Sequence, residues 1–150
     1  MDYKLTTYSE EETIELAQNI ESEKFPNMVI CLRGDLGSGK TVFTKGFAKA
    51  MEITEEVTSP TFNIIKEYTT GEMPLFHMDV YRLDGKVDEL GIEEYFTKRG
   101  ITIIEWSDLI EDILPKNRLR IRIKMVDENT RQFVITPYGS KYEDLCERVL

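Results

Sequence analysis

Apolar positions along the first third of the chain follow a helical, then a strand-like, then again a helical spacing. Ser9 and Glu12 form a capping box, and the partly helical apolar spacing that follows predicts a helix over residues 10–23. The short apolar run "MVICLRG" predicts a buried strand at residues 28–34. Aromatic and methionine side chains then recur at every fourth position, which predicts a helix over residues 40–51.

The remainder of the chain reads mainly as strands. "PLFHMDVYRL" alternates, so that Phe76, Met78 and Val80 face one way while His77, Asp79 and Tyr81 face the other. "RLRIRIKMV" alternates strictly and "RQFVITP" follows as its hairpin partner. Further strands are expected after the proline turn at 59–61, at 74–83, at 101–106, at 118–126 and at 131–137, with helical pieces at 90–100 and 142–150.

These elements predict an α/β fold. Strands alternate with helices early and a hairpin comes late, so we expect a three-layer sandwich whose mixed sheet has a parallel core and an antiparallel extension. The 150 residues are near the commonest size of one domain, and we find no repeat or linker. The sequence therefore predicts a single domain over residues 1–150.

Composition excludes several classes of protein. No apolar run reaches the roughly 20 residues of a membrane helix, and the first residues lack a secretory signal, so we expect a cytoplasmic protein without a membrane partner. Two cysteines without a CxxC pair and a single histidine cannot build a zinc site, and the thiols are expected to be reduced. The net charge of -9 argues against direct, tight nucleic-acid binding and suits docking on a basic protein partner.

The stretch "GDLGSGKT" carries the clearest chemistry. Gly34, four further residues, Gly39, Lys40 and Thr41 form a full Walker A pattern between a predicted strand and a predicted helix. Glycines let backbone N–H groups wrap a phosphate, Lys40 reaches the β- and γ-phosphates, and the Thr41 hydroxyl ligates Mg²⁺. The alternative is a flexible glycine turn, but a chance match is on the order of one in a hundred or less. We therefore expect nucleotide binding and a P-loop NTPase-like sandwich.

Carboxylates at strand ends are expected to complete this site. Glu105 ends the hydrophobic strand "ITIIE", as in a Walker B segment, and Asp79 lies late in the alternating strand. For each, the alternative is a surface acid at a strand end, and the functional role is favoured, more clearly for Glu105. Thr61 in "SPTF" is either a threonine that senses the γ-phosphate or part of a proline turn, and spacing alone does not decide.

Four further features have weaker interpretations. His77 is expected to be a structural hydrogen-bonding group more than a catalytic base, and Trp106 a core or pocket-wall residue. Arg82 is a phosphate contact, a partner contact or a surface cation. Four basic residues share one face of a strand and are either a docking stripe for RNA or an acidic partner, or a solvated face that discourages edge pairing, which we slightly favour. They are Arg118, Arg120, Arg122 and Lys124.

The motifs together resemble one family. "GDLGSGKT", "SPTF", "HMDVYRL", "ELGIEEYF" and "IEWSD" appear in this order, and from about Thr6 to near Thr136 the chain is similar to the bacterial TsaE (YjeE) family. The resemblance implies a cytoplasmic ATPase that binds ATP and Mg²⁺, hydrolyses ATP weakly alone and works with TsaD and TsaB. It also implies that TsaD transfers the threonylcarbamoyl group to the adenosine next to the anticodon of tRNAs reading ANN codons. The chain would then meet tRNA only indirectly, through the complex.

The resemblance also implies roles for individual residues. It favours Thr61 as a switch residue that senses the γ-phosphate and assigns Asp79 to the hydrolytic site. It also implies that Thr41 and Glu105 ligate Mg²⁺. It places the start of the first helix, near Glu10, and a hairpin arginine, Arg131, beside the nucleotide. The nucleotide loop would consist of Gly37, Ser38, Gly39, Lys40, Thr41 and Val42. Many members have a second threonine where Val42 stands, and alanine is frequent where Ser38 stands.

Three functions remain open on these grounds. The first is an accessory ATPase that changes the conformation of a partner complex. The second is a small-molecule kinase, which would need an acceptor pocket and an arginine-bearing lid that we do not find. The third is a scaffold that binds ATP without hydrolysing it. A GTPase is not expected, because no NKxD-like segment is present. In the first, the attacking water would lie near Asp79 or Thr61.

Overall fold

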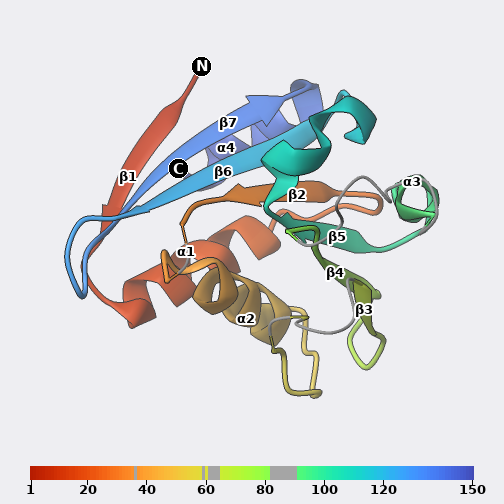
Figure 1. Cartoon of the computed structure of the whole chain (residues 1–150), viewed down its shortest axis with the longest axis horizontal. Helices are drawn as coiled ribbons and strands as arrows, with labels where there is room; N and C mark the ends of the chain where they lie inside the picture. Colours follow the sequence, from red (N-terminus) through yellow and green to blue (C-terminus); the bar gives the residue numbers. More distant parts are fainter. Residues whose placement is uncertain (36, 59, 61–64, 82–90) are drawn as a thin grey trace.

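Seven strands form one mixed sheet in the order β1-β7-β6-β2-β5-β4-β3 (Figure 1). This computed structural model describes residues 1–35, 37–58, 60, 65–81 and 91–150. The strands are β1 Tyr3–Thr7, β2 Val29–Arg33, β3 Ile65–Tyr68, β4 Leu75–Asp79, β5 Ile101–Glu105, β6 Arg118–Met125 and β7 Arg131–Tyr138. The helices are α1 Glu10–Glu21, α2 Lys40–Ala50, α3 Ile92–Tyr95 and α4 Ser140–Val149, with the 3-10 helix η2 Ser107–Ile113.

The predicted mixed sheet is confirmed. β2 pairs in parallel with both β5 and β6, and β5 pairs in parallel with β4. β7 is antiparallel to β6 and to β1, and β3 is antiparallel to β4. The carboxyl ends of the parallel strands therefore lie along one edge of the sheet, where ligand sites of α/β proteins form.

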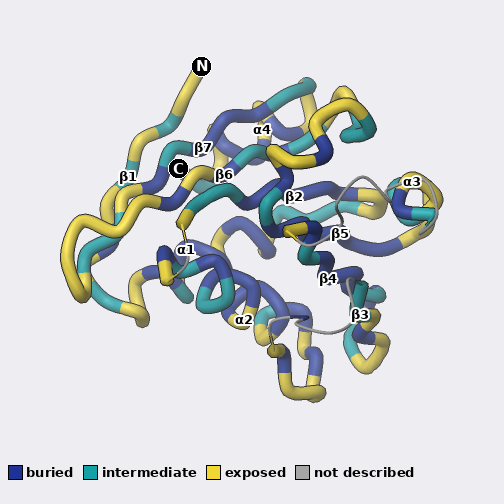
Figure 2. Tube along the Cα trace, in the orientation of Figure 1, coloured by how far each residue is buried: buried dark blue, intermediate teal, exposed yellow. Residues whose placement is uncertain are grey.

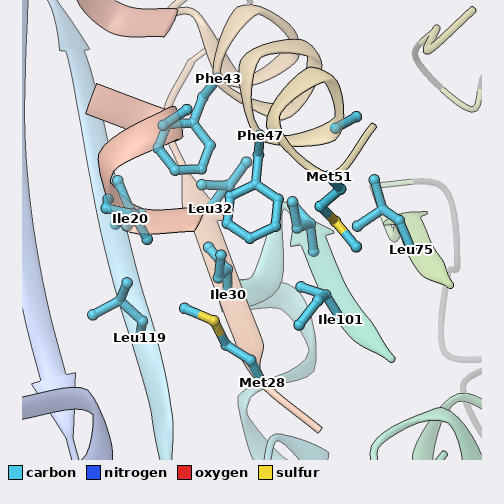
Figure 3. Close-up of a cluster of buried hydrophobic side chains, with 14 of the residues drawn as sticks. Ile20, Met28, Ile30, Leu32, Phe43, Phe47, Met51, Leu75, Ile101 and Leu119 are labelled. Carbon is cyan, nitrogen blue, oxygen red and sulfur yellow. The ribbon is translucent and has the colours of Figure 1, made fainter. Parts of the chain in front are cut away.

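One face of the sheet packs against α1, α2 and α4. Figure 3 shows Phe43 and Phe47 of α2 lying over Ile30 and Leu32 of β2, and all four side chains are fully buried. The every-fourth-residue aromatic spacing of α2 places these rings on one helix face. Burying a side chain of this size contributes roughly 1.5–3 kcal/mol, so this contact holds the start of α2 firmly above the end of β2.

The opposite face has a thinner and incomplete third layer. A second hydrophobic cluster joins α3 and η2 to β2, β4 and β5, and it includes Phe76, Met78 and Val80, which the alternating pattern placed on one side of the strand. η2 crosses in front of the sheet in Figure 1, while α4 lies behind β6 and β7. Among the described residues, this cluster draws none from β1, β6 or β7. The described residues thus form a three-layer α/β sandwich whose third layer covers only part of the sheet.

Several elements of the structure differ from those predicted from the sequence. The first helix ends at Glu21, two residues earlier than predicted, and the last begins at Ser140, two residues earlier than predicted. The sequence did not reveal β1 or η2. We slightly favoured a role for the basic residues of this strand in discouraging pairing at a sheet edge. That interpretation is wrong, because β6 is not an edge strand and lies between β7 and β2.

Burial follows the same arrangement. In Figure 2, β2 and β5 are buried along nearly their whole length, while the turn between β6 and β7 is exposed. Within the part of the chain that the structure describes, no helix combines the length and the apolar character needed to cross a membrane.

Candidate functional site

The glycine loop leaves the end of β2 and turns directly into α2. A Cβ atom on Gly34 would lie 2.6 Å from the carbonyl oxygen of Ile123 and 2.5 Å from Ser38 Oγ, so only glycine allows this approach to β6. Gly39, the residue before α2, has φ +112°, which also favours glycine. The glycine pattern thus fixes the loop against β6 and aims the helix start.

The amino end of α2 offers unpaired backbone donors. The N–H of Phe43 bonds to the carbonyl of Gly39, and the N–H groups of Lys40, Thr41 and Val42 come before this bond, so they have no partner within the helix. The helix dipole adds positive potential at the same point. This end of α2 is therefore suited to an anion such as a phosphate.

Lys40 holds its charge in a partly buried position. Its ammonium donates to the carbonyl oxygens of Gly34 at 2.6 Å and Asp35 at 3.0 Å, and it lies 4.3 Å from the centre of the Trp106 ring. Burial lowers the pKa of Lys40, while the nearby carboxylates of Glu105 and Asp79 oppose that shift. The lysine is thus a poorly hydrated cation held at the mouth of the loop.

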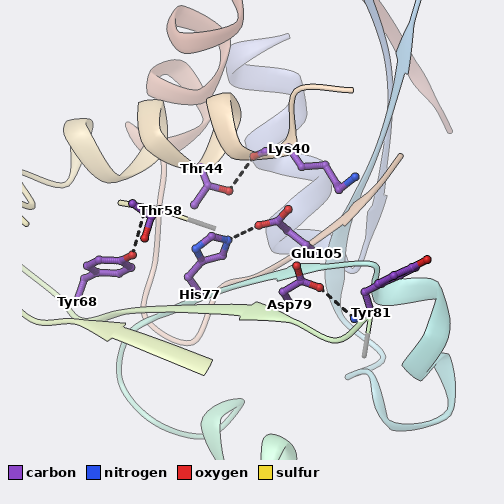
Figure 4. Close-up of polar contacts among 8 residues, drawn as sticks. All are labelled: Lys40, Thr44, Thr58, Tyr68, His77, Asp79, Tyr81 and Glu105. Carbon is purple, nitrogen blue, oxygen red and sulfur yellow. Dashed lines mark hydrogen bonds and ion pairs between the residues drawn. The ribbon is translucent and has the colours of Figure 1, made fainter. Parts of the chain in front are cut away.

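The two predicted acids lie on neighbouring strands at the same level. Asp79 of β4 and Glu105 of β5 are paired in the parallel register. Figure 4 shows their side chains rising from the sheet toward the start of α2. Glu105 Oε2 lies 2.5 Å from Nε2 of His77, and both residues are almost wholly buried. His77 is therefore the structural hydrogen-bonding group that the sequence predicted.

Asp79 has a different environment from Glu105. Its Oδ1 accepts the backbone N–H of Tyr81 at 3.0 Å, which fixes the carboxyl group at the end of β4. Burial raises the pKa of Asp79, the charge of Glu105 raises it further, and the Tyr81 hydrogen bond acts against both. The carboxyl group of Asp79 therefore takes up a proton more readily than that of an ordinary surface aspartate.

A cavity of about 360 Å³ joins these groups. Of the residues predicted from the sequence it is lined by Glu10, Gly37, Gly39, Lys40, Thr41, Val42, Asp79, Glu105 and Arg131. Gly34 lies behind the loop and lines a neighbouring groove, and Ser38 is buried beneath it. Thr61 and Arg82 lie outside the described residues. The structure thus brings nine predicted residues to one cavity.

The cavity also contains residues that sequence reasoning did not assign to it. Ser9 and Thr13 come from the start of α1, and Glu128 and Asn129 come from the β6–β7 turn. Trp106, expected from the sequence to be a core or pocket-wall residue, forms a wall of the cavity. The turn was visible in the sequence as "DENT", but nothing local showed that it folds over the glycine loop.

Arg131 ties that turn to the loop. Its guanidinium donates to the carbonyl oxygens of Asp127 at 2.8 Å and of Gly37 at 3.4 Å. Further donations go to the carbonyls of Glu128 and Thr130, both at 3.2 Å. The hairpin arginine therefore positions the rim of the cavity through backbone contacts.

Comparisons with known proteins identify the family to which the chain belongs. The family model described as "Threonylcarbamoyl adenosine biosynthesis protein TsaE" matches residues 7–133. The tRNA threonylcarbamoyladenosine biosynthesis protein TsaE of Bacillus subtilis is 47% identical over 146 residues, covering 97% of this chain and 92% of that protein. Its counterpart in Nostoc is 37% identical over 147 residues, covering 95% and 90%. A crystal structure of Bacillus subtilis YdiB superposes with a TM-score of 0.88 at 44% identity, covering 99% of this chain and 94% of that one. The chain therefore belongs to the TsaE family of tRNA threonylcarbamoyladenosine biosynthesis proteins.

Proposed function

We propose that this chain binds Mg-ATP in the cavity at the start of α2 and hydrolyses ATP as the accessory ATPase of a cytoplasmic complex with TsaD and TsaB. The complex would carry out threonylcarbamoylation of the adenosine next to the anticodon in tRNAs that read ANN codons, with TsaD making the transfer. One observation carries the ATPase proposal: Lys40, Thr41, Asp79 and Glu105, from three separate segments, line a single cavity.

The donor set of the cavity fits a magnesium nucleotide. The amino end of α2 and the Lys40 ammonium together suit the phosphate chain. Thr41 and Glu105 offer a hydroxyl and a carboxylate, the hard oxygen ligands that Mg²⁺ prefers, and phosphate oxygens and water complete such sites. When bound, Mg²⁺ would neutralise charge on the β- and γ-phosphates.

The proton chemistry would fall to Asp79. Its raised pKa makes it a better proton acceptor than an ordinary surface aspartate, and its hydrogen bond from Tyr81 holds it in place. We propose that it orients and deprotonates the attacking water, with Thr61 as the other candidate for positioning that water. Lys40 would offset the charge that develops on the transferred phosphoryl group.

Turnover by the isolated chain should be weak. Arg131 borders the cavity, but its donors are engaged with backbone carbonyls of the turn and the loop. In other phosphoryl-transfer enzymes, an arginine supplied in trans accelerates hydrolysis by about 10³–10⁵-fold. A docked partner, or Arg82 in this chain, would supply the missing cation.

Phosphate release from Mg-ATP tests this proposal, measured for the chain alone and with purified TsaD and TsaB. We expect slow release that rises when both partners are added and is lost in Lys40→Ala. Lys45→Ala is the matched control, because Lys45 is exposed on the same helix and does not line the cavity. Phosphate found on an acceptor instead of in solution would favour a kinase. Tight ATP binding with no release in any mixture would favour a scaffold.

A further inference from the structure

The face of the sheet that the third layer leaves uncovered is basic. β6 contributes Arg118, Arg120, Arg122 and Lys124 to it, β2 contributes Arg33, and β1 contributes Lys4. The strand register confirms that these side chains share one face, because Arg33 pairs with Arg122, Arg122 with Val134, and Val134 with Lys4. Four adjacent strands therefore present one row of side chains that contains three cations.

Among the described residues, most of this positive charge has no ion-pair partner. Arg33 is paired with Asp108 at 3.8 Å, and Arg118 donates to the carbonyl oxygens of Pro115 and Lys116. In the part of the chain that the structure describes, no ion pair involves the other four, Lys4, Arg120, Arg122 and Lys124. We call these four residues the basic patch.

Few of the described acids lie near the basic patch. Asp2 is hydrogen-bonded to Thr136, Asp108 is held by Arg33, and Asp35 lines the adjoining groove. Glu111 of η2 acts on Cys31, as do Arg118 and Arg120, so it lies close to the edge of the patch. The chain as a whole has a net charge of -9. The patch is thus a local reversal of sign on an acidic protein.

Strand geometry sets the size of the basic patch. Lys4 and Arg122 lie two strands apart, about 10 Å, and Arg120 and Lys124 lie four residues apart, about 14 Å. Arg120 is held in place because its guanidinium lies 5.6 Å from the centre of the Tyr138 ring. Lys4, Arg122 and Lys124 are exposed and Arg120 is half-buried. Regularly spaced cations on rigid strands match the repeated charges of a phosphate backbone.

The residues between these cations favour RNA over an acidic protein. The same rows contain Thr6, Gln132 and Thr136, which are hydrogen-bonding side chains, and the half-buried Val134. Protein–protein interfaces are enriched in aromatic residues, methionine and arginine and depleted in lysine, whereas two of the four patch residues are lysines. Nucleic-acid interfaces are polar and positively charged.

The basic patch adjoins the nucleotide loop. A groove of about 410 Å³ runs from Arg122, Lys124 and Gln132 to Gly34 and Trp106. Trp106 also forms a wall of the ATP cavity. A polyanion on the patch would therefore lie beside the loop, on the other side of this tryptophan.

We infer that the basic patch binds the phosphate backbone of tRNA directly. The family resemblance implied that tRNA is met only through partner proteins, and the net charge of the whole chain argued against tight nucleic-acid binding, but that net charge averages over this surface. Binding is weak, independent of base sequence and strongly dependent on salt, because the rest of the protein is acidic. The inference does not require ATP hydrolysis and is tested without nucleotide.

The test is fluorescence anisotropy of a labelled, unmodified tRNA transcript at 50 and 200 mM KCl. Four phosphate contacts predict that affinity falls about 50–150-fold between these concentrations. Arg122→Gln/Lys124→Gln leaves two contacts, so the fall should be only about 7–12-fold. Affinity at 50 mM should also drop about tenfold or more. Lys45→Gln/Lys49→Gln is the matched control: it removes the same charge from exposed positions on α2, and the wild-type salt dependence should persist.

Unfolding midpoints establish that each variant is folded. If the double variant does not fold, Lys4→Gln at the exposed first strand replaces it, with an expected fall of about 20–40-fold. Equal salt dependence in the patch variant and the α2 control would overturn the inference. The inference would also be overturned if the chain does not bind tRNA but binds poly-glutamate through the same residues. That result would identify an acidic protein as the occupant of the patch.

Discussion

Replacing His77 tests whether the hydrogen bond from this side chain holds Glu105 in place. His77 is fully buried, its Nε2 lies 2.5 Å from Glu105 Oε2, and the Glu105 side chain is 4% exposed. His77→Leu fills the buried position with an apolar side chain and leaves the Glu105 carboxylate without its hydrogen-bond donor. Water has little access to the buried carboxylate and cannot replace this hydrogen bond. A buried charged group that loses its partner costs about 1–3 kcal/mol or more.

Two measurements separate the consequences of this change. The unfolding midpoint should fall by about 2–4 °C for each kcal/mol in a chain of this size. On the proposal that Glu105 ligates Mg²⁺, the Mg²⁺ concentration that supports half-maximal ATP hydrolysis should rise about 10–100-fold, because residues that hydrogen-bond to a metal ligand orient it. His77→Gln keeps an amide donor and should recover part of both losses.

The control is a change on the other face of the same strand. Met78→Leu conserves core volume and should cost less than about 1.5 kcal/mol while leaving the Mg²⁺ dependence unchanged. If His77→Leu has the stability and the Mg²⁺ dependence of the unmodified protein, then His77 does not support Glu105 and the reasoning is refuted.

Three further predictions concern the scaffold of the site. Tyr142→Phe removes the hydroxyl that accepts the buried N–H of Val29 at 2.8 Å, so urea unfolding should show a loss of about 1–3 kcal/mol, and an unchanged midpoint would contradict this. Burial raises the pKa of Cys31 to about 12 and of Cys146 to about 11, so both thiols should resist maleimide at pH 8 until urea is added; rapid labelling of the folded protein would refute their burial. Gly34→Ala forces its Cβ against a β6 carbonyl, and should destabilise the fold by about 1–3 kcal/mol and weaken ATP binding in calorimetry, whereas wild-type values would show that the loop can move away.

Local signals in the sequence were sufficient for much of the fold. The capping box at the start of α1 is present, with Glu12 N–H donating to Ser9 Oγ at 3.2 Å. The Walker A pattern, its flanking strand and helix, and the acids at the ends of β4 and β5 are all where the pattern predicted them. These features depend on residues close together in the chain, or on the rule that parallel strands end at one edge of the sheet.

Features that depend on distant pairing were not predictable. β1 is a short edge strand whose register with β7 joins Tyr3 to Ile135, and its five residues carry little pattern of their own. The parallel pairing of β6 with β2 makes β6 an internal strand of the sheet, so its basic residues do not lie on an edge strand. Likewise, Glu128 and Asn129 reach the cavity only because the β6–β7 turn folds over the glycine loop.

The most direct test of the central claim is calorimetric titration of Mg-ATP into three proteins: the unmodified chain, Lys40→Ala and Lys45→Ala. We expect one saturable site in the unmodified chain and in Lys45→Ala, and no measurable binding in Lys40→Ala. Equal binding by all three proteins would show that the cavity at the start of α2 is not the nucleotide site. The absence of binding in the unmodified chain would contradict the ATPase proposal itself.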